Sequence, residues 1–304
     1  MENDQNRYQG CLLGLAVGDA VGTTVEFMPR GSFPIVTDML GGGPFNLYPG
    51  QWTDDTSMAL CLAHSLLEKN GHDPLDQMQR YMRWCREGYM SSTGKCFDIG
   101  RTVLEALGNF EKTGNPISGP TRGKSAGNGS LMRLAPVPMF YAPDMERAMF
   151  FSGESSRTTH GATEAVEACR LFGGMVVKAL AGKDKKYILL ENEIRQNITA
   201  TSILEISRGD YISKQVDQIM GTGYVVESLS AALWAFWHSN SFEEAILCAV
   251  NLGNDSDTTA AICGQIAGAY YGRTGIPLEW QAKLFKRDEI LALADQLSAP
   301  RATE

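Results

Sequence analysis

Two short segments, far apart in the chain, contain the residue types of a metal site. They are Gln51-Trp52-Thr53-Asp54-Asp55-Thr56 and Asn254-Asp255-Ser256-Asp257-Thr258-Thr259. Carboxylate and hydroxyl oxygens are the ligands that hard cations such as Mg²⁺ and Mn²⁺ prefer. Each segment alone also suits the start of a helix, because Thr and Asp cap helix N-termini and acidic groups favour the positive end of the helix dipole. Together they offer four carboxylates and two or three hydroxyls, enough to hold two cations bridged by water.

Three other metal or phosphate motifs fit the second segment poorly. The sequence has no set of His and Cys ligands typical of zinc. Asp255-x-Asp257-x-Thr259 matches the start of a haloacid-dehalogenase-type phosphatase motif, but that motif should follow an apolar strand early in a parallel α/β sheet. An EF-hand loop would need Gly at position 260 and Glu at position 266, where this chain has Ala260 and Ile266.

The elements that must position these segments are predicted to be helices. Apolar residues recur at helical spacing through Tyr8, Cys11, Leu12 and Leu15, then Met58, Leu62 and Leu66, then Met78, Tyr81, Met82 and Cys85. Further helices are predicted over 99–110, 163–180, 227–237, 242–250, 257–271 and 279–297. The alternation typical of strands is scarce, and no linker or repeat interrupts the pattern. We therefore predict one compact all-α domain spanning residues 1–304.

Composition narrows the class of protein. The chain has 304 residues, of which 43% are hydrophobic, and a formal net charge of −8. This charge, without a Lys/Arg-rich run, argues against a nucleic-acid or anionic-membrane partner. No uncharged stretch is long and apolar enough to span a bilayer, and the N-terminus lacks signal-peptide order. Seven scattered cysteines without a Cys-x-x-Cys pair fit a reducing cytoplasm. We expect a cytoplasmic protein and take a monomer as the default.

The order of motifs along the chain resembles the ADP-ribosyl glycohydrolase family, which includes the dinitrogenase-reductase-activating glycohydrolases. The resemblance covers nearly the whole chain and rests on an ordered set of segments. These are 10–22 (GCLLGLAVGDAVG), Glu26-Phe27, 41–43 (GGG), 49–56 (PGQWTDDT), 97–100 (FDIG), 127–133 (GNGSLMR), Thr159-His160, 221–224 (GTGY) and 253–259 (GNDSDTT).

The resemblance implies an all-α fold with a cleft that holds two Mg²⁺ or Mn²⁺ ions. The implied metal ligands are Thr53, Asp54, Asp55, Asp255, Asp257 and Thr258. Glu26 would act as general base or as a mobile gate over the metals, with Asp55 as a second candidate base. Asp98 would lie near the scissile ribosyl bond, although it also suits a cap for the helix predicted to begin at position 99.

The resemblance also implies where the substrate binds. The loop Gly127-Asn128-Gly129-Ser130 would hold the diphosphate, since glycines let backbone N–H groups approach phosphate oxygens. Tyr224 would stack on adenine, with Gly223 letting the loop bend. His160 would line the phosphate or ribose region. The alternatives are a core position for Tyr224 and a hydrogen-bonded helix-start residue for His160.

One stretch departs from the family. The activating glycohydrolase carries acidic residues shortly before its Gly-Asn-Gly loop, where they can hold the guanidinium of ADP-ribosylated arginine. Here residues 121–126 include Arg122 and Lys124 and no acid. This difference leaves the acceptor open among arginine, serine or threonine, a nucleic-acid end and O-acetyl-ADP-ribose.

The resemblance predicts a metal-dependent hydrolase that cleaves a ribosyl glycosidic bond. Its substrate would be an ADP-ribosylated protein or another ADP-ribosylated molecule, and ADP-ribose would be the product. A water activated by a carboxylate would attack the anomeric carbon, while Asp98 or another acid protonates the leaving group. The alternative is a non-catalytic ADP-ribose-binding or structural member of the same fold.

Overall fold

The computed structural model describes residues 2–191, 195 and 198–299, and the predicted domain of residues 1–304 extends beyond these ranges. The helices are α1 (Glu2–Gly22), α2 (Asp54–Lys69), α3 (Pro74–Glu87), α4 (Arg101–Thr113), α5 (Pro136–Tyr141), α6 (Met145–Arg157), α7 (Thr163–Leu180), α8 (Lys185–Leu190), α9 (Thr201–Arg208), α10 (Val225–His238), α11 (Phe242–Val250), α12 (Ser256–Tyr271), α13 (Leu278–Lys283) and α14 (Arg287–Ser298). Extended pairing within the described ranges is confined to two isolated bridges, Gly42 with Leu47 and Gly127 with Tyr224. The all-α prediction is confirmed.

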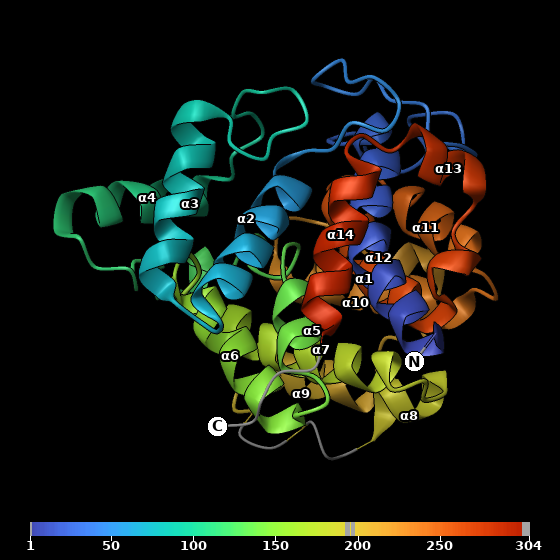
Figure 1. The fold of residues 1–304 in the computed structure, drawn as a ribbon. Coiled ribbons are helices and arrows are strands. Elements are labelled where there is room, and N and C mark those ends of the chain that lie inside the picture. Colours follow the sequence, from blue (N-terminus) through green and yellow to red (C-terminus); the bar gives the residue numbers. More distant parts are fainter. Residues whose placement is uncertain (1, 192–194, 196–197, 300–304) are drawn as a thin grey trace.

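Helices α1 and α12 lie side by side at the centre of the molecule (Figure 1). One face of α1 carries a glycine at every fourth position, at Gly10, Gly14, Gly18 and Gly22. A Cβ at Gly14 would stand 2.3 Å from the carbonyl oxygen of Gly264, and one at Gly18 would stand 2.1 Å from that of Ala260. The two backbones therefore touch along most of their length, which fixes the start of α12 relative to the end of α1.

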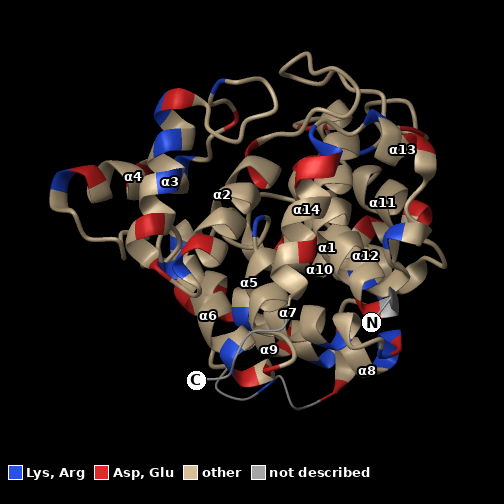
Figure 2. Ribbon diagram, in the orientation of Figure 1, with Lys and Arg blue, Asp and Glu red and all other residues tan. Residues whose placement is uncertain are grey.

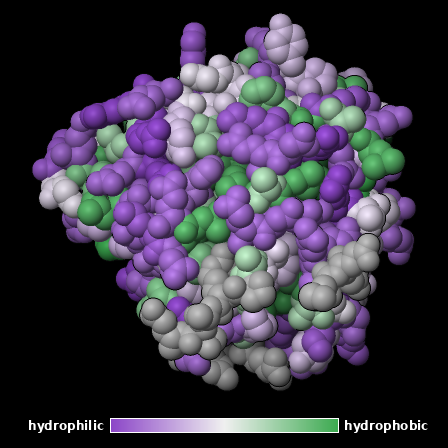
Figure 3. Space-filling model, viewed as in Figure 1, coloured by the Kyte–Doolittle hydropathy of each residue, from purple (hydrophilic) through white to green (hydrophobic). Residues whose placement is uncertain are grey.

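The other helices pack around this central pair. A large apolar core joins α1, α7, α10, α11, α12 and α14, and a smaller cluster between α2, α3 and α4 includes Met58, Tyr81 and Val103. Lys, Arg, Asp and Glu lie mainly on outer helices such as α3 and α8, whereas α12 is almost free of charge (Figure 2). The face shown in Figure 3 is mostly hydrophilic with small scattered apolar areas. None of the described helices is long and apolar enough to cross a membrane.

The predicted helices are present, with one clear correction. Helices α7 and α11 match the predicted ranges, but the helix predicted over 279–297 is two helices, α13 and α14. The chain turns between them because Lys286 adopts a left-handed conformation, with φ 50°. The break lets the N–H of Phe285 donate to the carbonyl of Gly50 at 3.0 Å, next to the first acidic segment.

Helix α6 was missing from the sequence prediction for a physical reason. Its buried face consists of small or hydroxyl-bearing residues, namely Ala148, Ser152, Gly153, Ser155 and Ser156. A helix that packs through such residues has no apolar period for a pattern search to find.

Candidate functional site

The two acidic segments lie at the N-termini of α2 and α12. Thr53 is the N-cap residue of α2 and Asp255 is that of α12, but neither side chain accepts a capping hydrogen bond from the backbone of its own helix. Asp54, Asp55 and Asp257 occupy the first helical turns. The helix dipoles favour this concentration of acids, while the side chains remain free for interactions between the two segments.

These side chains meet across more than two hundred residues of sequence. The hydroxyl oxygen of Thr53 lies 3.2 Å from one oxygen of Asp55 and 3.2 Å from one oxygen of Asp257. The hydroxyl of Thr258 lies 3.4 Å from the same Asp55 oxygen. The structure thus brings together four of the six side chains proposed as metal ligands.

Asp19, in α1, was not assigned a role from the sequence. Its carboxylate accepts hydrogen bonds from the backbone N–H and the hydroxyl of Thr53, both at 2.9 Å, and from the N–H and the hydroxyl of Thr56 at 3.0 and 2.6 Å. Since the Thr53 hydroxyl has one proton and its nearest acceptor is Asp19, its lone pairs face Asp55 and Asp257. The sequence feature that could have pointed to Asp19 is that it is a single acidic residue among the apolar residues of the first helix.

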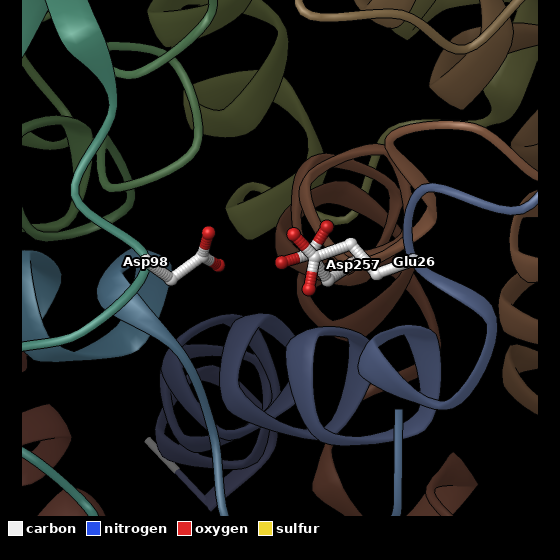
Figure 4. A group of neighbouring side chains, drawn as sticks. All are labelled: Glu26, Asp98 and Asp257. Carbon is white, nitrogen blue, oxygen red and sulfur yellow. The ribbon is translucent and has the colours of Figure 1, made fainter. Parts of the chain in front are cut away.

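A second group of carboxylates faces these helix ends. Glu26, Asp98 and Asp257 each place one oxygen within 4.8 Å of the others. Glu26 and Asp257 lie beside each other, and Asp98 faces them from the opposite side (Figure 4). Glu26 follows a short 3-10 turn, Thr23–Val25, that continues from α1. The next residue, Phe27, donates its backbone N–H to the carbonyl of Asn254, in the second acidic segment, at 2.7 Å.

Asp98 does not cap α4. The N-cap residue of that helix is Gly100, and Asp98 adopts a left-handed conformation with φ 57° two residues earlier. A non-glycine residue in this region is uncommon and is held there by its surroundings. Here the conformation directs the carboxylate toward Glu26 and Asp257 (Figure 4).

Burial raises the pKa of every carboxyl group in this cluster, and repulsion between carboxylates adds to the rise for Glu26, Asp54, Asp55, Asp98 and Asp257. Burial is the main cause for Asp19, whose pKa rises to about 6, and for Asp98, whose pKa rises to about 7. Burial and then the charge of Asp98 raise the pKa of Glu26 to about 10. The pKa values of Asp54, Asp55, Asp255 and Asp257 are also raised, again chiefly by burial. Such a cluster favours either protons or cations.

The carboxylates open into a cavity of about 630 Å³. Its lining residues are Glu26, Phe27, Asp54, Asp98, Ile99, Gly100, Arg101, Thr102, Val103, Gly127, Asn128, Gly129, Met132, His160, Thr222, Gly223, Asn254, Asp255, Asp257 and Thr258. Thr53 and Asp55 lie behind this surface and are fully buried. The volume is typical of small-molecule sites, which run to several hundred cubic ångströms.

The glycine loop lines the cavity next to the second acidic segment. Asn128 donates its backbone N–H to the carbonyl of Gly223 at 3.1 Å and its side-chain amide to Asp255 at 2.7 Å. The ring of His160 packs under this loop, because a Cβ at Gly129 would stand 2.9 Å from it. Burial and the nearby Arg133 lower the pKa of His160 to about 3, so the imidazole is neutral.

Tyr224 lies at the edge of the site. Its backbone bridges to Gly127, its hydroxyl donates to Glu164 at 2.7 Å, and 37% of its surface is exposed. It is therefore not a core aromatic. Tyr224 is not among the residues that line the cavity, although its neighbour Gly223 is.

The basic stretch before the glycine loop turns away from the cavity. Arg122 pairs with both carboxylate oxygens of Glu105, in α4, at 2.9 and 2.7 Å. Arg122 and Lys124 are exposed, and neither lines the cavity. These two cations therefore do not oppose a positively charged leaving group inside the cavity.

Comparison with known proteins assigns the family. The sequence profile of the ADP-ribosylglycohydrolase family matches residues 1–304. The chain is 44% identical over 305 residues to ADP-ribosylarginine hydrolase Tri1 of Pseudomonas putida, covering 100% of this chain and 81% of that protein. It is 31% identical over 305 residues to the ADP-ribosyl-[dinitrogen reductase] glycohydrolase of Rhodospirillum rubrum, covering 95% of this chain and 97% of that one. A solved structure described as an ADP-ribosylglycohydrolase-related protein complex superimposes with a TM-score of 0.86 at 44% identity, covering 98% and 99% of the two chains. The chain therefore belongs to the ADP-ribosylglycohydrolase family and hydrolyses ADP-ribosyl linkages.

Proposed function

We propose that this chain is an ADP-ribosylarginine hydrolase that uses two divalent cations, Mg²⁺ or Mn²⁺. Residues 1–304 would act as one catalytic domain. The observation that carries the proposal is the meeting of the acidic N-termini of α2 and α12 at the wall of the cavity. The relative from Pseudomonas putida supports arginine as the acceptor, since it is named an ADP-ribosylarginine hydrolase.

The donor atoms present fit hard cations. One oxygen each of Glu26, Asp55 and Asp257 is buried without a hydrogen-bond partner among the described residues. A buried carboxylate oxygen without a partner is costly, and an oxygen-rich set of this kind suits Mg²⁺ or Mn²⁺ more than zinc. The residues proposed to hold the cations are Thr53, Asp54, Asp55, Asp255, Asp257 and Thr258.

Bound cations would hold the ribose hydroxyls, neutralise the carboxylates and make nearby water more acidic. The chain itself supplies the remaining chemistry. Glu26 lines the cavity and has an unpartnered oxygen there, so it is the better placed base to take a proton from the attacking water. Asp55 is fully buried behind the surface and is the second candidate.

Asp98 is proposed to protonate the leaving group. It faces Glu26 and Asp257 (Figure 4) and lines the cavity, so it is placed to give a proton to a leaving group bound there. The glycine loop and His160, which line the same cavity, would hold the diphosphate, and Tyr224 at the edge would contact adenine.

The acceptor preference follows from the cavity charge as well as from the relatives. Five carboxylates line the cavity, from Glu26, Asp54, Asp98, Asp255 and Asp257, against one lining arginine, Arg101. A positively charged guanidinium leaving next to Asp98 would be stabilised there. Serine or threonine, a nucleic-acid end and O-acetyl-ADP-ribose remain the competing acceptors, because each offers an oxygen instead.

A hydrolysis panel tests this proposal. Release of ADP-ribose should occur from ADP-ribosylarginine, require Mg²⁺ or Mn²⁺, and disappear in Asp54→Ala and Asp257→Ala. The exposed Asp210→Ala is a matched acidic control and should keep full activity.

The competing outcomes are distinct. Hydrolysis of ADP-ribosylserine or O-acetyl-ADP-ribose instead would overturn arginine as the acceptor. Full activity in either Asp variant would overturn the metal site. Tight ADP-ribose binding without release from any substrate would favour a non-catalytic binder.

A further inference from the structure

Arg133 is a fully buried cation that has no acidic partner. Its guanidinium donates to the carbonyl of Gly129 at 3.1 Å and to the hydroxyls of Thr159 and Thr158 at 2.7 and 3.3 Å. It packs over the ring of Tyr81 at 4.6 Å, and no carboxylate among the described residues pairs with it. Its Nε is buried without an acceptor. A buried, uncompensated charge is unfavourable unless the site gains something from it.

The hydroxyl of Thr159 links Arg133 to His160 through two consecutive hydrogen bonds. Thr159 Oγ1 lies 2.7 Å from the guanidinium and 2.9 Å from His160 Nδ1. A guanidinium only donates, so Thr159 accepts from Arg133. Among the described residues, His160 Nδ1 is the only acceptor within reach of the Thr159 hydroxyl proton, so that proton is assigned to the bond with Nδ1. Nδ1 is then the acceptor of the neutral ring, and the proton of the imidazole sits on Nε2.

The Nε2 atom of His160 is directed at the glycine loop. A Cβ at Gly127 or Gly129 would stand 3.3 or 3.2 Å from it, and His160 lines the cavity. Nε2 has no hydrogen-bond partner among the described residues. Its N–H is therefore available to a ligand that lies on the loop.

Arg133 also orients the loop itself. The carbonyl of Gly129 points at the buried guanidinium. Because a trans peptide places C=O and N–H on opposite sides, the N–H of Ser130 in the same peptide unit points away from Arg133. Within the described residues, neither this N–H nor that of Gly129 has an acceptor.

We propose that Arg133 is a positioning residue that holds the His160 Nε2–H and the Ser130 N–H as a pair of donors for the anionic diphosphate of ADP-ribose. The charge of Arg133 stays beneath the loop, and the bound anion supplies its missing counter-charge. The inference rests on the proposed function for the identity of the anion, but the hydrogen-bond relay from Arg133 through Thr159 to His160 is independent of it.

Two adjacent threonines allow a matched test of the relay. Thr158 and Thr159 are both fully buried and both accept from Arg133, but Thr158 gives its proton to the carbonyl of Ser155 at 2.7 Å. We expect Thr159→Val to disturb the His160 tautomer and Thr158→Val to leave it intact, with a similar loss of stability in both. The readout is the two-bond ¹H–¹⁵N spectrum of the four histidines, with His160 assigned from the His160→Gln variant.

Ligand binding provides the second readout. Thr159→Val should weaken ADP-ribose binding about tenfold, which corresponds to about 1.4 kcal/mol, while adenosine, which lacks the diphosphate, binds as before. Thr158→Val should bind both ligands like the parent protein. Arg133→Lys should retain more affinity for ADP-ribose than Arg133→Met, because the lysine ammonium can still donate to Gly129 or to Thr159.

Several results would overturn the inference. These are a His160 that carries its proton on Nδ1 in the parent protein, an unchanged tautomer and affinity in Thr159→Val, or equal losses in the two threonine variants. A parent protein that does not bind ADP-ribose would contradict the proposed function, whereas the tautomer measurement would still decide the relay.

Discussion

The carboxylate of Asp19 accepts four hydrogen bonds from Thr53 and Thr56, and these bonds fix the Thr53 hydroxyl relative to Asp55 and Asp257. Asp19 does not line the cavity. Groups that orient metal ligands from behind commonly contribute as much to metal affinity as some of the ligands do. Asp19 is therefore expected to control the site without touching the substrate.

Replacing Asp19 by Asn tests this role. The amide keeps the shape of the side chain, but its NH₂ group cannot accept hydrogen bonds. Either Thr53 or Thr56 therefore loses the oxygen that accepts from its N–H and its hydroxyl. We expect Mn²⁺ affinity to fall about ten- to a hundredfold, measured by calorimetry. The matched control is Glu167→Gln, since Glu167 is a buried acid that likewise accepts from backbone N–H groups and a hydroxyl, at Thr199 and Ala200. Unchanged Mn²⁺ affinity in Asp19→Asn would contradict the role.

The sequence indicated acidic residues that the structure brings together, but it did not indicate the residues that support them. Asp55, Asp255 and Asp257 are recognisable because acidic and hydroxyl residues gather in two short segments. Asp19 and Arg133 each stand alone in an apolar stretch, and their importance depends on contacts with residues 26 to 37 positions away. Spacing within a segment carries no information about such contacts.

The glycine face of α1 sets the position of α12 and therefore of Asp257. A Cβ at Gly22 would stand 2.4 Å from the Cα of Asp257 itself, and one at Gly10 would stand 2.2 Å from the carbonyl oxygen of Gly268, at the other end of α12. Both glycines are thus equally crowded, but they touch opposite ends of the same helix.

We predict that Gly10→Ala and Gly22→Ala destabilise the protein similarly, by about 1 to 3 kcal/mol for a crowded interior position. Only Gly22→Ala should greatly reduce activity at temperatures where both variants are folded, since it displaces the first turn of α12. Gly108→Ala in α4, where an added Cβ meets nothing within 4 Å, is the control and should be neutral or slightly stabilising. Urea unfolding and turnover measure the two effects; equal activity in the two crowded variants would contradict the expectation.

Element boundaries were predictable where apolar periodicity is strong. Helices α7 and α11 match the predicted ranges because they bury apolar residues at regular spacing. The turn between α13 and α14 was missed because Lys286 is not a residue type that signals a left-handed turn. Helix α6 was missed because its buried face is built from Ser, Ala and Gly.

For the molecule as a whole, the buried acids make stability depend on both pH and metal. A carboxyl group whose pKa is raised on folding stays protonated in the folded chain while it ionises in the unfolded chain. The folded state then binds more protons between about pH 4, the usual value, and its own pKa, so stability falls as pH rises through that range. The relevant folded pKa values are about 6 for Asp19, about 7 for Asp98 and about 10 for Glu26.

Bound Mg²⁺ should counteract this loss of stability at higher pH. In EDTA we expect Tm to fall from pH 5 to pH 8, and Mg²⁺ to restore it more at pH 8 than at pH 5. A cation at about 100 times its Kd contributes about 2.7 kcal/mol, which raises Tm by about 3 to 5 °C for a chain of this size. Differential scanning fluorimetry measures this, with NaCl at equal ionic strength as the control for screening. A Tm that rises with pH in EDTA would argue against the cluster.

The close pairing of α1 with α12 also determines when, during synthesis on the ribosome, the site of this protein can assemble. Ser256 Oγ donates to the carbonyl of Gly22, 234 residues earlier, so the glycine face of α1 lacks its partner helix until α12 has been synthesised. At about 5 to 20 residues per second, that wait lasts about 10 to 50 seconds. During this time Asp19 and the first acidic segment lack Asp257. A chain that ends before α12 therefore has no assembled centre, and activity can begin only after α12 has been synthesised.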